Sequence, residues 1–201
     1  ELIQSGLKDH DVDPNVVHLL PPEREGVKAL LEATKYVDII IPRGSQKLID
    51  FVRENAKVPT IETGAGIVHV YVDASADVDK AQKIVENSKT KRPSVCNALD
   101  CLIIHRDRLS DLPTIMHDLP DHGVEVFADE ESYKVLNGSY DEKLLKKATD
   151  ESFGTEFLSL KMSIKTVNDL EEALSHIAKY SSKHSEAILA EDEKTIDEYL
   201  K

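Results

Sequence analysis

The sequence predicts an α/β fold built around a mostly parallel sheet, on the basis of three observations. Short apolar runs of strand length alternate along the chain with segments whose apolar residues recur at helical spacing. Strand–helix–strand units of this kind have right-handed crossovers, which make the strands parallel. With 201 residues, 40% of them hydrophobic and 31% charged, the chain can bury a core as one large domain or two small ones.

The first sixty residues read as strand, helix, strand, helix, strand. Strands are expected where apolar runs are stopped by proline or glycine, at residues 16–20, 37–41 and 58–61. Helices are expected where apolar residues recur at helical spacing, namely Val27, Leu30 and Leu31 within residues 23–34, and Leu48, Ile49 and Val52.

The remaining sequence continues this alternation. Strands are expected at residues 67–72, 102–105, 124–127 and 187–190, with an extended segment at residues 157–164. Helices are expected at residues 109–119 and 193–200, after Asp77 as an N-cap, and after Asn168 or Asp169 as an N-cap. The inward faces of the two capped helices would carry Val78, Ala81, Ile84 and Val85, and Leu170, Leu174, Ile177 and Ala178. Residues 129–150 are polar and predict only a short helix and a loop.

Charge and cysteine content narrow the functional class. The net charge of −13 and the pI near 5.0 argue against a nucleic-acid or anionic-membrane surface. Two cysteines only five positions apart do not form a disulfide framework, which favours a reducing, cytoplasmic setting. The sequence shows neither a signal peptide nor an apolar run long enough to span a bilayer.

One of the two cysteines lies on a basic, proline-interrupted loop, in the segment KTKRPSVCNALD. Lys89, Lys91 and Arg92 precede Cys96 and supply the positive charge that favours a thiolate nucleophile. The alternative is a small buried hydrophobe, which is the commoner role of a free cysteine. Cys101 lies inside an apolar strand, and we expect it to be buried and inert.

Other candidate sites carry weaker signals. The turn Arg43-Gly44-Ser45 leads into a helix and would present backbone N–H groups to a phosphate. The segment ETGAG, residues 62–66, follows a strand and its glycines allow close approach of backbone or ligand. An ordinary tight turn explains both equally well. The eight histidines show no metal-ligand spacing, so we expect no metal site and place His176 and His184 on the surface.

The order of these features resembles the aldehyde dehydrogenase superfamily. Glu62 on a glycine-rich turn, a strand ending at Asp73, the helix start ADVDKA, a cysteine 34 residues beyond Glu62, and the segment Thr155-Glu156-Phe157 follow one another as they do there. The segments VPTIETGAGIVHVYVD, KTKRPSVCNALDCLIIHRD and HSEAI resemble its γ-glutamyl phosphate reductase branch. The resemblance covers nearly the whole chain.

The resemblance implies an aldehyde-dehydrogenase-like α/β fold and the middle of the enzyme. Residues 1–63 would be the end of a Rossmann-like cofactor-binding domain. Residues 64–201 would form most of the catalytic, cysteine-bearing domain without its C-terminal segment. The family's N-terminal strands, and its C-terminal segments for oligomerisation, would lie outside this sequence.

The resemblance also implies a role for individual residues. Cys96 would be the nucleophile, Asn97 would stabilise the oxyanion, and Glu62 would accept the proton of Cys96 or have no role. Gly44 and Ser45 would lie beside the cofactor phosphates, and Glu156 would hold the nicotinamide ribose. From charge and proximity rather than from the family, Arg92 and Lys91 would hold the phosphate of the substrate.

The implied reaction is the NADPH-dependent reduction of L-glutamate 5-phosphate to L-glutamate 5-semialdehyde in proline biosynthesis, through a cysteine thioester. The implied partners are further copies of the chain and, for substrate channelling, glutamate 5-kinase. Two alternatives stay open. The chain could be an inactive or stand-alone α/β binding module, or an aldehyde dehydrogenase that acylates CoA. The segment RPSVCNA favours the phosphate substrate over the CoA thioester.

Overall fold

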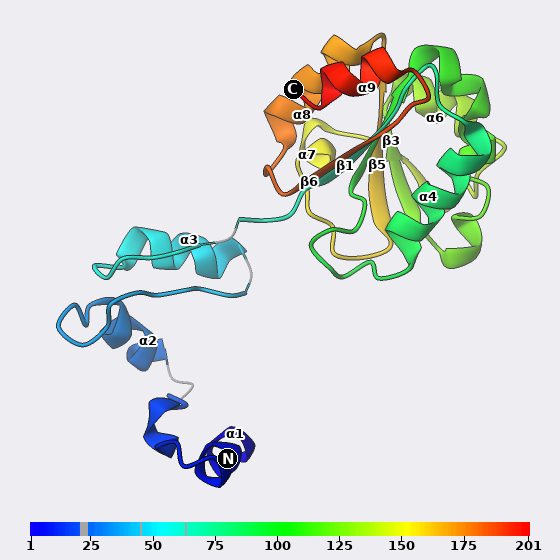
Figure 1. Cartoon of the computed structure of the whole chain (residues 1–201). Coiled ribbons are helices and arrows are strands. Elements are labelled where there is room, and N and C mark those ends of the chain that lie inside the picture. Colours follow the sequence, from blue (N-terminus) through cyan, green and yellow to red (C-terminus); the bar gives the residue numbers. More distant parts are fainter. Residues whose placement is uncertain (21–23, 45, 63) are drawn as a thin grey trace. The chain divides into compact units, whose positions relative to one another are not determined.

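The chain forms two compact units, Glu1–Gly64 and Ala65–Lys201. The computed structural model describes residues 1–20, 24–44, 46–62 and 64–201 and is shown in Figure 1. The second unit contains a parallel sheet covered by helices, which confirms the predicted α/β class. The assignment of cofactor binding to the first unit and catalysis to the second stays a prediction.

The second unit is built on a six-stranded sheet with the strand order β4-β3-β5-β2-β1-β6. Its strands are β1 (Val68–Val72), β2 (Cys101–His105), β3 (Glu125–Ala128), β4 (Leu145–Lys147), β5 (Lys161–Val167) and β6 (Ser185–Leu189). All neighbouring pairs are parallel. The central strands β1 and β2 are buried almost throughout, as expected of parallel strands covered on both faces.

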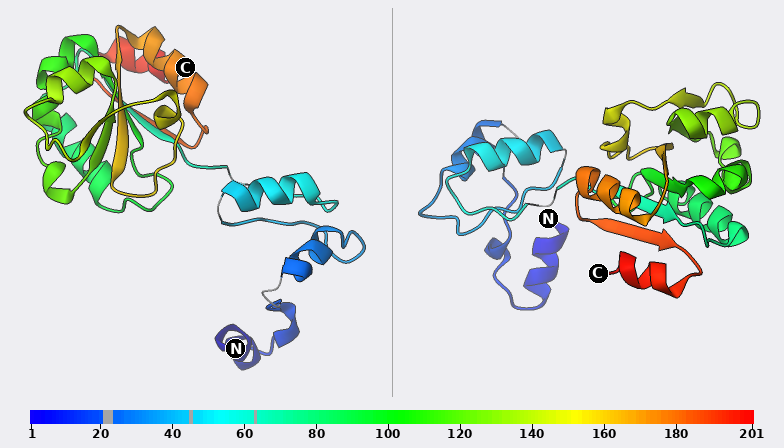
Figure 2. Two further views of the ribbon diagram at one scale, coloured as in Figure 1. Left: turned by 180° about the vertical axis from the view of Figure 1, so that it is seen from behind. Right: turned by 90° about the horizontal axis from the view of Figure 1, so that it is seen from above.

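Helices cover both faces of this sheet (Figures 1 and 2). On one face, α4 (Val78–Thr90), α5 (Leu112–Ile115) and α6 (Glu130–Leu136) pack against Val70, Val72, Leu102 and Ile104. On the other face, α8 (Leu170–Tyr180) and α9 (Glu193–Tyr199) pack against Tyr71, Cys101 and Ile103. Because side chains alternate along a strand, each central strand contributes to both cores.

Aspartate N-caps fix where four helices of this unit begin. The carboxylates of Asp77, Asp129, Asp169 and Asp192 accept hydrogen bonds from the backbone N–H groups of Lys80, Ser132, Glu172 and Thr195. Each bond satisfies a backbone donor that the first turn of a helix leaves unpaired. The predicted caps Asp77 and Asp169 are therefore confirmed.

Several predicted details of the second unit are wrong. Residues 109–119 form the end of a 3₁₀ helix, η2 (Arg106–Asp111), and then the single turn α5, where a longer helix was expected. The polar stretch after residue 129 contains α6, β4 and the start of α7 (Asp150–Phe153). The segment expected to be extended at 157–164 becomes strand only from Lys161.

The inward faces of two helices also differ from those predicted. On α4, Ala81 and Val85 are buried, whereas Ile84 is 41% exposed. Buried Lys89 continues the inward face of this helix instead. On α8, Ala178 is exposed, and the buried residues are Ala173 and His176.

The first unit contains helices but not the three strands predicted for it. Its elements in the described residues are α1 (Leu2–Asp9), η1 (Pro14–Val16), α2 (Arg24–Leu31) and α3 (Gln46–Asn55). Among these residues, the only strand-like pairing is an isolated parallel bridge between Ile40 and Thr60. A parallel pair needs neighbouring strands and cover on both faces. Here Ile39, Ile41 and Ile61 remain exposed, so these runs bury too little to form a sheet.

No helix of the described residues combines the length and the apolar composition that crossing a bilayer requires.

Candidate active site around Cys96

Cys96 lies in a turn between the end of α4 and the start of β2, and it is exposed. The backbone N–H of Lys91 caps the end of α4 by donating to Asn87. Pro93 cannot donate to a continuing helix, so the chain leaves the helix here. The turn is closed by a bond from the Ala98 N–H to the Val95 carbonyl, at 3.1 Å. The sequence-predicted loop position of Cys96 is therefore correct.

The sequence suggested that Lys89 adds to the exposed charge near this loop, but in the structure it does not. Its side chain is fully buried, and its Nζ donates to the Leu99 carbonyl at 2.6 Å. Burial lowers the pKa of Lys89 to about 8, although the nearby Asp100 carboxylate, 3.9 Å away, opposes this shift. The charge on the exposed side of the loop comes from Lys91 and Arg92, both exposed.

Asp100, just before β2, is bonded to the first residue of β1, to the segment before β5 and to β5 itself. One carboxylate oxygen accepts from the Phe157 N–H at 3.0 Å and the other from the Val68 N–H at 3.4 Å. Its backbone carbonyl accepts from the Ser163 N–H at 2.7 Å. Burial raises the pKa of Asp100, and the two backbone donors and Lys89 work against that rise. Nothing in the local sequence distinguished this aspartate from an ordinary surface residue.

Gly66 brings the glycine-rich turn against the cysteine. A Cβ atom built on Gly66 would lie 2.3 Å from the backbone oxygen of Cys96, so only glycine fits. The N–H of Gly66 donates to Oε1 of Glu156 at 2.8 Å. At Gly64, by contrast, an added Cβ meets nothing within 4 Å. Gly66 thus contacts both Cys96 and the predicted cofactor residue Glu156.

A pocket of about 450 Å³ opens between the end of α4 and the cysteine loop, although Cys96 itself does not line it. Its lining comes from the end of α4 and from the cysteine loop, namely Asn87, Ser88, Lys91, Arg92, Val95, Asn97 and Ala98. Three predicted site residues, Lys91, Arg92 and Asn97, therefore share one cavity. Among the described residues, neither cation has an ion-pair partner, and the N–H groups of Cys96 and Asn97 donate to none. The pocket offers positive charge and unused donors to an anion.

The remaining predicted residues belong to the first unit. Arg53 lies 3.7 Å from the Oε1 of Glu62, and the two residues form a partly exposed ion pair. Gly44 has a φ of +152°, a conformation that favours glycine, just before α3. A Cβ at Gly44 would also lie 2.9 Å from the Leu48 side chain. Ser45 lies outside the described residues.

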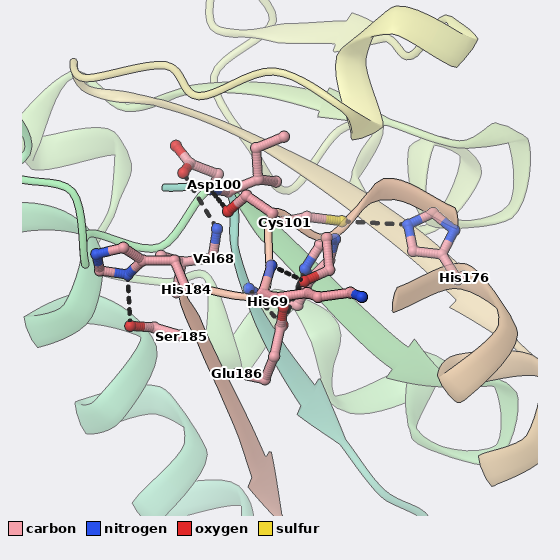
Figure 3. Close-up of polar contacts among 12 residues, drawn as sticks. Val68, His69, Asp100, Cys101, His176, His184, Ser185 and Glu186 are labelled. Atoms are coloured by element: carbon pink, nitrogen blue, oxygen red, sulfur yellow. Dashed lines mark hydrogen bonds and ion pairs between the residues drawn. The ribbon is translucent and has the colours of Figure 1, made fainter. Parts of the chain in front are cut away.

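A second cluster lies on the helix α8 side of the sheet and was not predicted. The side chains of His69, Cys101 and His176 are buried, with their potential ligand atoms all within 4.8 Å of one another. Figure 3 shows the contact between Cys101 and His176. The expected surface position of His176 is therefore wrong, whereas His184 is exposed. The helix α8 hides the histidine because His176 follows the buried Ala173 by three residues.

Burial sets the titration of this second cluster. It raises the pKa of Cys101 to about 12 and, helped by His69, lowers the pKa of His176 to about 4. Cys101 is thus a protonated thiol at neutral pH, in keeping with its predicted burial. Cys96 is the exposed thiol of the two.

Comparisons with known proteins point to one family. No family model matches the chain. It is 60% identical over 201 residues to a γ-glutamyl phosphate reductase of Pelodictyon phaeoclathratiforme, covering all of this chain and 48% of that protein. It is also 60% identical over 195 residues to one of Parabacteroides distasonis, covering 97% of this chain and 47% of that protein. The chain therefore spans about half the length of the curated relatives it matches.

Solved structures agree with this result. A crystal structure of γ-glutamyl phosphate reductase from Thermotoga maritima matches with a TM-score of 0.88 and 37% identity, covering 98% of this chain and 47% of that one. A propionaldehyde dehydrogenase of Rhodopseudomonas palustris with bound propionyl-CoA matches with a TM-score of 0.69 and 16% identity, covering 98% of this chain and 51% of that one. This second likeness establishes the aldehyde-dehydrogenase-like fold alone.

Proposed function

Because this chain belongs to the γ-glutamyl phosphate reductase family, of whose curated members it spans about half, we propose that it forms part of a reductase of L-glutamate 5-phosphate. The product would be L-glutamate 5-semialdehyde, with release of inorganic phosphate, as a step of proline biosynthesis. The observation that carries this proposal is the identity of 54–60% over essentially the whole chain with proteins of that name.

Cys96 is the proposed nucleophile. Its thiolate attacks the acyl carbon of the substrate, a carbon–sulfur bond forms, and the bond from that carbon to the phosphate oxygen breaks. The resulting thioester divides one difficult reduction into two easier steps. The exposure of Cys96 in a turn and the close packing of Gly66 against its carbonyl support this role, because the loop is both accessible and held in place.

Asn97 and the backbone N–H of Cys96 are the proposed donors to the oxyanion. Negative charge develops on the carbonyl oxygen when the thiolate attacks, and fixed donors at that position lower the barrier. Both groups are next to the nucleophile in the chain. Among the described residues, neither the backbone N–H of Cys96 nor the side-chain amide of Asn97 donates a hydrogen bond, so both are available to a substrate.

Lys91 and Arg92 are the proposed site for the phosphate of the substrate. Together with Asn97, they line the pocket between the end of α4 and the cysteine loop. A guanidinium pairs with two phosphate oxygens at once, and a second cation adds to the attraction. Since the protein as a whole carries a charge of −13, this pocket is a local exception that suits an anionic substrate.

NADPH is the proposed reductant, and the described residues fit a nicotinamide cofactor. Glu156 uses Oε1 to accept from Gly66, while its other carboxylate oxygen accepts from no described residue and remains for a ribose hydroxyl. Gly44 and Ser45 precede the ten-residue helix α3, whose first N–H groups suit a phosphate. When bound, the cofactor supplies the hydride that reduces the thioester carbonyl.

Glu62 is proposed either to accept the proton of Cys96 or to have no role in the reaction. The reaction reduces an acyl group and needs no activated water, so a water-activating base would only waste the thioester. We also propose a cytoplasmic location, a homo-oligomer, and glutamate 5-kinase as a channelling partner, since direct transfer would protect a hydrolysable acyl phosphate.

The test is an assay of the intact protein in the reverse direction, with glutamate 5-semialdehyde and NADP⁺. NADPH formation that depends on inorganic phosphate supports the proposal. Formation that depends on CoA instead identifies a CoA-acylating aldehyde dehydrogenase, and no formation under either condition supports the binding module.

A substitution of Arg92 tests whether this pocket binds the phosphate. Arg92→Gln should raise the KM for phosphate by roughly tenfold, about 1.4 kcal/mol, as expected for loss of a charge-assisted contact. Arg106→Gln is the matched control, because Arg106 is exposed and pairs with Glu131 away from the pocket. An equal effect of both variants would remove the phosphate role from Arg92.

A further inference from the structure

The buried cluster on the α8 side of the sheet is built by strand register. His69 on β1 is the register partner of Cys101 on β2 and of Glu186 on β6. The three residues therefore form one row across three neighbouring strands. Side chains of register partners lie on the same face of a sheet, about 5 Å apart at their Cβ atoms. Helix α8 then places His176 over this row, as Figure 3 shows.

The donor atoms of the cluster converge. The Sγ of Cys101 lies 3.7 Å from the Nε2 of His176, and the ligand atoms of all three residues are within 4.8 Å of one another. The Nδ1 of His69 faces Glu186 at 3.0 Å, which leaves its Nε2 for another partner. That Nε2 is buried and has no hydrogen-bond partner among the described residues. A buried imidazole nitrogen without a partner is costly and requires an explanation.

We propose that His69, Cys101 and His176 bind a zinc ion through two imidazole nitrogens and one thiolate. Zinc takes nitrogen ligands at about 2.0–2.1 Å and sulfur at about 2.3 Å, so ligand atoms of a tetrahedral site are roughly 3.3–3.6 Å apart. The Cys101–His176 separation already nearly matches this spacing. Rotation of the histidine side chains that shortens the longest separation by up to about 1.5 Å brings in the third ligand, and the fourth position takes water.

The carboxylate of Glu186 is the hydrogen-bond partner that would orient His69 toward the metal. Histidines that bind metals commonly donate their second ring N–H to a carboxylate, which fixes the tautomer and aims the free nitrogen at the ion. The His69–Glu186 pair has this arrangement. A pocket of about 610 Å³ is lined by Glu186 and by Ile177, the neighbour of His176, and none of the three proposed ligands lines it.

Metal binding would change the charge of this buried cluster. Binding replaces the thiol proton with the ion, and that proton goes to solvent. The site then carries one net positive charge, which the carboxylate of Glu186 faces. The ion would link β1, β2 and α8 and thereby stabilise the second unit.

Zinc titration of the intact protein carrying Cys96→Ser tests the proposal, since that change removes the exposed thiol as a competing ligand. Competition with a chromophoric chelator should show one tightly bound zinc ion. Adding Cys101→Ser or His176→Gln should weaken binding at least about a hundredfold, and Glu186→Gln about tenfold. His184→Gln is the matched control and should change nothing, because His184 is exposed. Binding that survives Cys101→Ser at full strength, or no stoichiometric binding, overturns the proposal.

Cobalt(II) in place of zinc provides an independent measurement if a cluster variant does not fold. The Cys96→Ser protein should show a thiolate-to-cobalt charge-transfer band at one equivalent of metal. Zinc at a large excess over its Kd should also raise the melting temperature, since it binds only the folded state. Cobalt binding without the band would place the ion away from Cys101 and contradict the proposed site.

Discussion

The two cysteines, five positions apart, have opposite surroundings. Cys96 lies exposed in a turn beside a cationic pocket, whereas Cys101 is buried against α8 in the first position of β2. The segment between them leaves the surface and enters the sheet, and buried Lys89 and Asp100 hold it there. The route of the backbone, rather than the nature of the thiol, therefore decides which cysteine a substrate can reach.

The strongest test of this comparison is activity. In the intact enzyme, Cys96→Ser should lower turnover by at least about a thousandfold, because a serine hydroxyl is a poor substitute for a thiolate. Cys101→Ser should lower turnover by less than tenfold. Its main effect should be a loss of about 1–3 kcal/mol in the free energy of unfolding, from burying a hydroxyl. Initial rates and urea denaturation of both variants measure the two effects, and equal losses of turnover would refute the division of roles.

The rate of alkylation distinguishes the same two thiols in the unmutated protein. We expect limiting iodoacetamide at neutral pH to label Cys96 at least about a hundredfold faster than Cys101, which is buried and protonated. Mass-spectrometric mapping of the two peptides gives the ratio. Preferential labelling of Cys101 would exclude Cys96 as the nucleophile.

Gly66 allows a test of the loop itself. Gly66→Ala places a methyl group 2.3 Å from the Cys96 oxygen and must displace the loop. Misplacement of a reacting group by about 1 Å can cost about a hundredfold in rate, and we expect a loss of that order. Gly64→Ala, where the added methyl meets nothing, should change the rate less than twofold. Similar rates for both variants would show that the contact does not position Cys96.

Lys89 allows a test on stability rather than on rate. Its pKa is lowered to about 8 in the folded protein from 10.5, so between these values the unfolded chain binds more protons. Stability should therefore rise from pH 8 to pH 10.5, by up to about 3 kcal/mol from this group. Denaturation across this range measures the slope, and Lys89→Met should reduce it. An unchanged slope in that variant would assign the effect to other groups.

The sequence predicts the second unit better than the first. Its central strands are continuous apolar runs and two of its helices begin at recognisable aspartate caps, so local pattern and tertiary structure agree. In the first unit, apolar runs such as residues 37–41 have strand character but too few partners to form a sheet. The short strand β4 has one buried residue, Leu145, and so no pattern to detect.

The candidate site was predicted in part for a similar reason. The position of Cys96 follows from proline and charge, which are local. Which glycine contacts it depends on residues far apart in sequence, and Gly64 and Gly66 look alike before folding. Lys89 and His176 were expected to be exposed because polar residues usually are. Burial on α4 and α8 reflects the sheet beneath these helices, which no single window of sequence reports.

The hydrogen bond between Gly66 and Glu156 joins residues 90 positions apart, and this separation orders events during synthesis. Ribosomes add about 5–20 residues per second, so roughly 5–18 s pass between the appearance of the two partners. After Cys96 has been added, a further 60 residues, or roughly 3–12 s, pass before Glu156 appears, and the strand β5 that follows Glu156 comes later still. The nascent thiol therefore waits, without its finished surroundings, for the part of the chain that completes them.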